Sequence, residues 1–139
     1  MSTVAEPPSG TLVGNATLLQ AITKAVDNCF SMCNMQAQCV SVSSVPVRDP
    51  GRITGMIGVH GKASGFVTVN MSDQIAMAAV GGLLDERFDQ LTPQVVDGAG
   101  EITNIIAGGM KNCLAGTQWA FSHVTVPSVI IGQNYQIAY

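Results

Sequence analysis

Residues 92–116 read TPQVVDGAGEITNIIAGGMKNCLAG, and this stretch decides how the rest of the chain is interpreted. Thr92 at the cap position and Pro93 at the first helical position are typical of a helix start. Apolar residues then recur at helical spacing as far as Gly116, which predicts a helix with one buried face. These residues are Val95, Ala99, Ile102, Ile106, Met110 and Cys113.

A polar stripe runs along the same predicted helix. Its members follow one another at steps of four, three, four and three residues, which places them on one face, roughly opposite the apolar one. The first carboxylate and the amide are about 10 Å apart along the helix axis. We therefore expect an exposed surface on which another molecule docks. The stripe consists of Asp97, Glu101, Asn104, Gly108 and Lys111.

Glycines interrupt this helix at Gly98, Gly100, Gly108 and Gly109. Each glycine destabilises a helix by about 1 kcal/mol relative to alanine. Solvation of a polar face does not explain that cost. Two explanations stay open at this point: close approach of a partner molecule, and close packing of helices inside the domain.

Composition narrows the class of protein. A chain of 139 residues fits one domain with its own core, and 47% hydrophobic against 11% charged residues indicates that part of the surface is buried, for example against a second copy. The net charge of -3 and the absence of a Lys/Arg cluster argue against binding to nucleic acid or anionic membranes. No signal peptide and no membrane span are recognisable, so a cytoplasmic location is expected.

Cysteines and histidines give no metal-site pattern. No CxxC pair is present, and His60 and His123 are far in sequence from the cysteines and from each other. We therefore expect Cys29 and Cys33 to be reduced core residues and the histidines to be structural, with no metal site and no cofactor held by this chain. The four cysteines are Cys29, Cys33, Cys39 and Cys113.

The N-terminal half predicts a helix followed by strands. Residues 1–13 have little pattern and are expected to form a flexible arm, with one domain over residues 14–139. Helical spacing of apolar residues predicts a first long helix over residues 15–35. Alternation over residues 40–47 predicts a bent edge strand, and residues 53–71 predict a β-hairpin.

The C-terminal half completes an α+β fold. Ser72 is expected to cap a short helix, and residues 119–131 predict strand structure broken at Pro127. A last strand is expected over residues 135–139. Together the elements predict a mainly antiparallel sheet with two long helices packed on it.

The pattern Asp97-x-x-x-Glu101-x-x-Asn104, followed after 22 residues by Pro127, resembles the signature of the CheC/CheX/FliY phosphatases of bacterial chemotaxis. The resemblance runs from the first helix to the C-terminus and includes the hairpin ITGMIGVHGKASGFVTV. It implies an α/β architecture with long helices against an antiparallel sheet. It also implies dephosphorylation of the phospho-aspartate of a CheY-type response regulator.

The resemblance implies roles for the stripe residues. Asn104 would place a water molecule in line with the phosphoryl group without bringing negative charge toward it. Glu101 would pair with the active-site lysine of the receiver domain, and Asp97 would add an outer contact. The receiver would supply Mg²⁺, and this chain would need no cofactor of its own. Further partner contacts are expected from Gly100, Gly108 and Lys111.

An internal pseudo-repeat indicates which branch of the family is closest. Residues 22–46 align with residues 102–127 as a helix and a strand leading to proline. Ala21 then takes the place of Glu101, and Lys24 that of Asn104, so only one site is expected to be active. A single site resembles CheX, which implies a homodimer. CheX-type chains usually continue with further strands after the position that corresponds to Tyr139. A sheet without those strands is expected to have an unpaired edge, which a second copy of the chain could cover.

Two other functions remain as alternatives. A non-catalytic interaction module could use the same helix to bind a receiver or a switch component. A metal-dependent hydrolase could use Asp97 and Glu101, although two carboxylates on one helix lack the histidine or further acid that such sites recruit.

Overall fold

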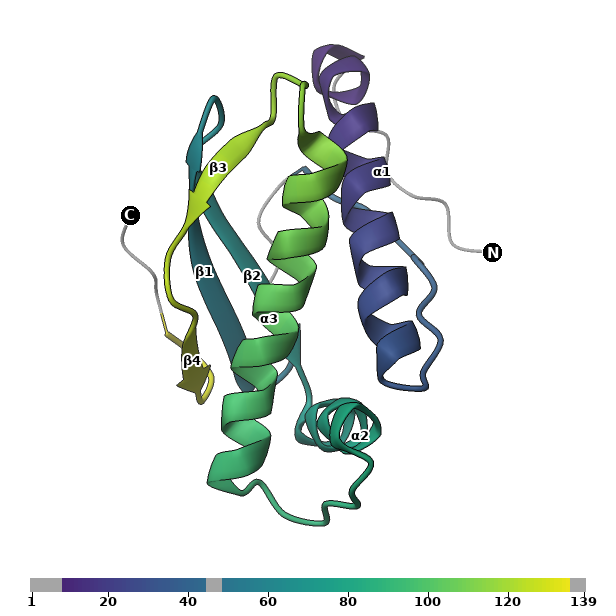
Figure 1. The fold of residues 1–139 in the computed structure, drawn as a ribbon, viewed down its shortest axis with the longest axis vertical. Coiled ribbons are helices and arrows are strands. Elements are labelled where there is room, and N and C mark those ends of the chain that lie inside the picture. The colour runs from purple at the N-terminus through teal and green to yellow at the C-terminus, as the bar shows by residue number, and fades with distance from the viewer. Residues whose placement is uncertain (1–8, 45–48, 136–139) are drawn as a thin grey trace.

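The computed structural model of the chain describes residues 9–44 and 49–135. Three helices and four strands are arranged in the order α1, β1, β2, α2, α3, β3 and β4 (Figure 1). The helices are α1 (Ser9–Met32), α2 (Asp73–Leu84) and α3 (Pro93–Leu114). The strands are β1 (Ile53–Gly61), β2 (Gly65–Met71), β3 (Phe121–Val124) and β4 (Ser128–Ile131).

The strands form one antiparallel sheet around β1. On one side β1 pairs with β2 over the whole hairpin, from Ile53 opposite Met71 to Val59 opposite Gly65. On its other side β1 pairs first with β4 and then with β3. The break between β3 and β4 contains Pro127, which has no N–H to donate to the sheet. The predicted interruption of this strand is therefore confirmed.

Helix α3 lies on the sheet and connects it to the other helices. It packs against β1, while α1 packs mainly against α3 and runs beside it in the opposite direction (Figure 1). The core is formed between these layers by Ile53 and Ile57 of β1, Ile102 and Ile106 of α3, and Cys29 of α1. The expectation of two long helices therefore holds, but only α3 covers the strands directly.

Capping residues in the sequence correctly predicted where two helices begin. The hydroxyl oxygen of Thr92 accepts a hydrogen bond from the Val95 N–H at 3.2 Å, and Pro93 is the first residue of α3. Ser72 caps α2 in the same way, with 3.1 Å between its Oγ and the Ile75 nitrogen. Each cap satisfies a backbone donor that the helix leaves unpaired.

Three sequence-based expectations need correction or lie outside the described residues. Helix α1 begins at Ser9, directly after Pro8 in the sequence, so residues 9–13 are helical rather than part of an arm. Residues 40–44 form no strand, and Val40 is 73% exposed. The predictions for residues 1–8, 45–48 and 136–139 lie outside the part of the chain that the structure describes.

None of the helices in the described ranges is long and apolar enough to cross a membrane.

Candidate functional site

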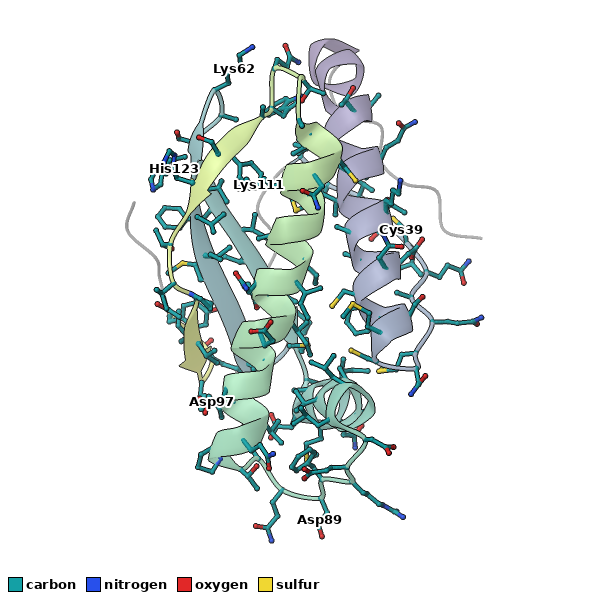
Figure 2. The ribbon with its side chains drawn as sticks, viewed as in Figure 1. Cys39, Lys62, Asp89, Asp97, Lys111 and His123 are labelled. Atoms are coloured by element: carbon teal, nitrogen blue, oxygen red, sulfur yellow. The ribbon has the colours of Figure 1, made fainter. Side chains whose placement is uncertain are left out.

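The predicted polar stripe lies on the surface of α3. Asp97, Glu101 and Lys111 are exposed, and Asn104 and Gly108 are partly exposed. In Figure 2, Asp97 lies toward the start of α3 and Lys111 toward its end. The stripe therefore carries negative charge in its first half and a positive charge in its last turn.

Close packing on the opposite side of the helix turns this stripe outward. Thr103 is fully buried, and its hydroxyl donates a hydrogen bond to the Ala99 carbonyl at 2.9 Å. A Cβ placed on Gly55 of β1 would lie only 1.8 Å from Thr103 Oγ1. Because Gly55 has no side chain, α3 approaches the sheet closely with Thr103 facing inward, and Glu101 and Asn104 face away from the core.

Sequence reasoning missed Gly55 and Thr103 as residues that position the stripe. A signal was present, because Gly55 occupies an inward position of a strand pattern between Ile53 and Ile57. Glycine at such a position is typical of close backbone approach.

Two of the glycines in α3 serve packing inside the domain. A Cβ on Gly98 would lie 2.5 Å from the Val80 side chain of α2, and one on Gly109 would lie 3.1 Å from Ala25 Cβ of α1. These contacts favour the second explanation of the glycines, close helix packing, at both positions.

Gly100 was predicted to contact a partner, and in the structure it is covered by other residues of this chain. It is buried, and a Cβ there would lie 3.4 Å from the Val129 side chain and 3.8 Å from the Pro127 ring. Gly100 therefore packs against Pro127, which lies between β3 and β4, and against Val129 of β4. This contact also brings Pro127, the most distant position of the signature, beside the stripe.

Gly108 differs from the other three glycines. A Cβ built on it would meet nothing within 4 Å among the described residues, although Gly108 is only partly exposed. The fold itself gives no reason for a glycine here. Its lack of a side chain leaves the stripe flat, one helical turn after Asn104.

The polar groups of the stripe are available for a partner. Within residues 9–44 and 49–135, no hydrogen bond or ion pair occupies the side chains of Asp97, Glu101, Asn104 or Lys111. The described residues also contain no group of three His, Cys, Asp or Glu side chains that could hold a metal ion. The stripe can therefore offer a carboxylate and an amide to another molecule.

The buried cysteines lie behind α3. Burial raises the pKa of Cys29 to about 12 and also raises the pKa of Cys33. The Cys29 thiol lies 3.9 Å from the Ile102 carbonyl oxygen, to which it donates. Such thiols remain protonated and behave as small apolar residues.

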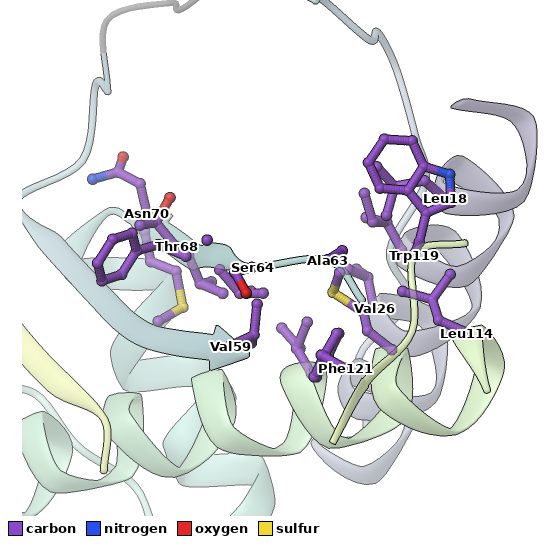
Figure 3. A pocket seen from close by; sticks show the side chains of 18 of the residues that line it. Leu18, Val26, Val59, Ala63, Ser64, Thr68, Asn70, Leu114, Trp119 and Phe121 are labelled. Carbon is purple, nitrogen blue, oxygen red and sulfur yellow. The ribbon is translucent and has the colours of Figure 1, made fainter. Parts of the chain in front are cut away.

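A second surface, which we call the β2 groove, lies between α1, α3 and β2. It has a volume of about 600 Å³ and includes Leu18 and Val26 of α1, Leu114 of α3, and Trp119 (Figure 3). None of the described residues that line it is charged. Within the described ranges β2 pairs only with β1, so its other edge faces this groove.

Comparison with known proteins identifies the family. The family model described as chemotaxis phosphatase CheX matches residues 53–139, which include all of α3. This chain belongs to the CheX family. The match covers the hairpin, the polar stripe and Pro127, and it therefore confirms the resemblance on which the interpretation rested. The search of curated proteins gave no match.

Solved structures show the same fold. CheX from Vibrio vulnificus is 25% identical, aligns over 89% of this chain and 80% of its own, and has a TM-score of 0.70. A CheC-like superfamily protein from Shewanella sp. PV-4 is 24% identical over 89% of this chain and 82% of its own, with a TM-score of 0.72. These matches confirm the predicted α+β architecture of the CheC/CheX type.

A third solved structure contains a complex. CheX from Borrelia burgdorferi was solved with CheY, BeF₃ and Mg²⁺, and it is 19% identical to this chain. It aligns over 85% of this chain and 76% of its own, with a TM-score of 0.61. At this identity the likeness concerns the fold.

Proposed function

We propose that this chain accelerates hydrolysis of the phospho-aspartate of a CheY-type response regulator. The observation that carries the proposal is the placement of Glu101 and Asn104 on one exposed face of α3, in a chain of the chemotaxis phosphatase CheX family. The helix then acts as a probe that enters the receiver's active site, since the reacting group belongs to the partner. The proposal places the protein with its receiver in the cytoplasm.

Asn104 is proposed to position the attacking water. Its amide can both donate and accept hydrogen bonds, and it carries no charge that the phosphoryl oxygens would repel. In phosphoryl transfer most of the catalytic effect comes from positioning and charge stabilisation, and an amide side chain suits the positioning part. Asn104 is partly exposed and free of partners within the described residues, so it is available for this role.

Glu101 is proposed to fix the docking pose. It precedes Asn104 by three residues, so the two side chains are neighbours on the helix surface. A carboxylate that pairs with the receiver's lysine forms a charge-assisted hydrogen bond of defined geometry. In this proposal the receiver holds Mg²⁺, and this chain brings no cofactor of its own.

The outer stripe residues are proposed to extend the contact. Asp97 lies one turn before Glu101 and can meet a cation of the partner, while Lys111 can meet an acidic group near the far end. Gly108 allows the partner's backbone to approach α3 closely, because no side chain stands between them. Gly100 acts indirectly in this scheme, by seating Pro127 next to the stripe.

A receiver-binding module without catalysis is the alternative. The complex of the Borrelia burgdorferi CheX with CheY is an observation about that protein, and it is compatible with both functions for this chain. The two functions differ in what they require of Asn104. Docking alone tolerates its loss, whereas hydrolysis does not.

The test compares binding and turnover in two variants. Asn104→Ala is expected to bind a phosphorylated CheY-type receiver nearly normally and to lose about 100-fold in turnover. Glu101→Ala is expected to lose about 1.5–3 kcal/mol of binding free energy, which is tenfold or more in Kd. Full turnover by Asn104→Ala would contradict the proposed role of Asn104, and unchanged binding by Glu101→Ala would contradict the docking role of Glu101.

The same proposal includes a homodimer that uses the β2 groove. The groove is apolar and uncharged, and among the described strands β2 pairs only with β1 beside it. Contiguous apolar surface next to a sheet edge is a typical site for association. A partner surface without charges fits such a groove. Because only 11% of its residues are charged, a second copy of this chain can provide such a surface. A second copy that covers the groove would bury the exposed side chain of Ile22.

A further inference from the structure

The only two histidines of the chain meet on the sheet. His60 in β1 lies directly opposite His123 in β3 in the antiparallel register. Both side chains are exposed. Considered alone, each histidine had no partner in the sequence, and the pair exists only because β3 returns to the end of β1.

A β-bulge turns His123 toward the same face as His60. In the strand register, His123 lies opposite His60 and Phe121 lies opposite Gly61. Ser122 therefore has no partner in β1 and is the extra residue of the bulge. Phe121 is buried. Without this insertion, strand alternation would turn His123 inward with Phe121. Bulges of this kind re-aim a side chain. The sheet therefore presents two imidazoles side by side on the face opposite the helices.

Each imidazole ring keeps at least one nitrogen that no hydrogen bond among the described residues occupies. His123 Nδ1 is hydrogen-bonded with Ser122 Oγ at 2.9 Å, which leaves its Nε2 available. His60 Nε2 lies on the side of Gly58, since a Cβ there would be 3.7 Å from it, and the Thr125 side chain fills the space above this glycine. No other hydrogen bond or ion pair holds either ring within residues 49–135. In Figure 2, the Lys62 side chain extends beyond the hairpin tip, away from His123.

We propose that His60 and His123 together bind a divalent ion of the late first-row transition series, such as Cu²⁺, Ni²⁺ or Zn²⁺. Directly opposed residues of antiparallel strands have Cβ atoms about 4.5–5.5 Å apart, and an imidazole nitrogen coordinates zinc at about 2.0–2.1 Å. Two rings on one face can therefore share one ion. The Ser122 contact orients the His123 ring, as outer hydrogen bonds do in known metal sites.

The remaining coordination positions are taken by water, because no third His, Cys, Asp or Glu side chain of the described residues joins the pair. Imidazole ligands favour Cu²⁺ over Ni²⁺ and Zn²⁺ in the usual affinity order. The site lies on the outer face of the sheet, while the polar stripe lies on α3. It is therefore independent of the proposed phosphatase site.

The test is titration of the full chain, purified with a tag that contains no histidine, with Cu²⁺, Ni²⁺ and Zn²⁺ in separate experiments. We expect one ion per chain, with Cu²⁺ bound most tightly, and a Cu²⁺ electron paramagnetic resonance spectrum that shows two nitrogen ligands. His60→Ala and His123→Ala should each lower the affinity on the order of 100-fold, because one anchored ligand is lost. Ser122→Ala should lower it by about tenfold.

Two control variants separate this site from others. Cys39→Ser removes an exposed thiol that could also bind these ions, and it should leave the affinity unchanged. Asn104→Ala should likewise bind the ion normally. Because both histidines are exposed, their variants should keep the circular dichroism spectrum of the wild type. Wild-type affinity in either histidine variant, or a spectrum with a single nitrogen ligand, would overturn the proposal.

Discussion

Gly55 of β1 lies directly beneath Thr103 of α3, so close that a Cβ on Gly55 would fall 1.8 Å from Thr103 Oγ1. Thr103 lies between Glu101 and Asn104 in the sequence and is fully buried. Glu101 is exposed and Asn104 is partly exposed. This contact decides the rotation of α3 about its own axis. The direction of the proposed functional side chains therefore depends on a residue that is distant in the sequence and has no side chain.

A Gly55→Ala variant should be destabilised by about 1–3 kcal/mol, because the added methyl group overpacks the contact between β1 and α3. Chemical denaturation of wild type and variant measures the difference in free energy of unfolding. Stability equal to that of the wild type would mean that α3 does not approach the sheet as closely as the structure places it.

Gly108→Ala should have the opposite effect on stability. A Cβ at Gly108 meets nothing within 4 Å of the described structure, so alanine should stabilise the helix by about 0.5–1 kcal/mol. If a receiver docks closely against this face, the same variant should bind it more weakly. Gly98→Ala is the matched comparison, since its Cβ would lie 2.5 Å from the Val80 side chain, and it should be destabilised.

The glycines of α3 show that local features could be predicted from the sequence, whereas contacts between distant residues could not. Thr92, Pro93 and Ser72 act on neighbouring residues, so the starts of α2 and α3 could be predicted from local chemistry. The stripe could be predicted for the same reason, because helical periodicity relates positions along one element. Whether Gly100 is covered depends on where Pro127 and Val129 lie, and no local pattern contains that information.

The same limit applies to pairings between strands. The opposition of His60 and His123 depends on a bulge at Ser122, which a regular alternation pattern does not reveal. The prediction of a strand over residues 40–47 is wrong for residues 40–44, which the structure describes, and the reason is related. Alternating valines favour a strand only when a neighbouring strand accepts their hydrogen bonds, and residues 40–44 have none in the described sheet.

Stability should fall at alkaline pH because of Cys29. Its pKa is raised from 9.0 to about 12 by burial, so in the unfolded chain the thiol loses its proton at lower pH than in the folded chain. Between these values the folded state binds more protons, and the free energy of unfolding decreases as pH rises. Unfolding titrations from pH 8 to pH 10.5 measure this slope, and Cys29→Ala should flatten it.

Thiol labelling supplies a second readout of the same burial. At pH 8 a thiol reagent should modify the exposed Cys39 rapidly in the folded protein and Cys29 only after unfolding. Rapid labelling of Cys29 in the folded protein would contradict its buried position.

The proposed dimer predicts a difference between two exposed residues of α1. Ile22 lines the β2 groove and Met32 does not, although Met32 is the more exposed of the two. Ile22→Lys should shift the protein toward monomers, because it would place a charge in an apolar interface, and Met32→Lys should leave the dimer intact. Sedimentation velocity at several protein concentrations measures both. A wild type that remains monomeric throughout, or equal effects of the two variants, would argue against the groove as the interface.

The most direct test of the central claim is phosphate release from a phosphorylated CheY-type receiver, measured with wild type, Asn104→Ala and Asn112→Ala at equal concentrations. Asn112 is an exposed asparagine near the end of the same helix and provides the matched control. We expect acceleration of phosphate release by the wild type and by Asn112→Ala, and a loss of about 100-fold in Asn104→Ala. A wild type that binds the receiver without accelerating release, or an Asn104→Ala variant as active as the wild type, would contradict it.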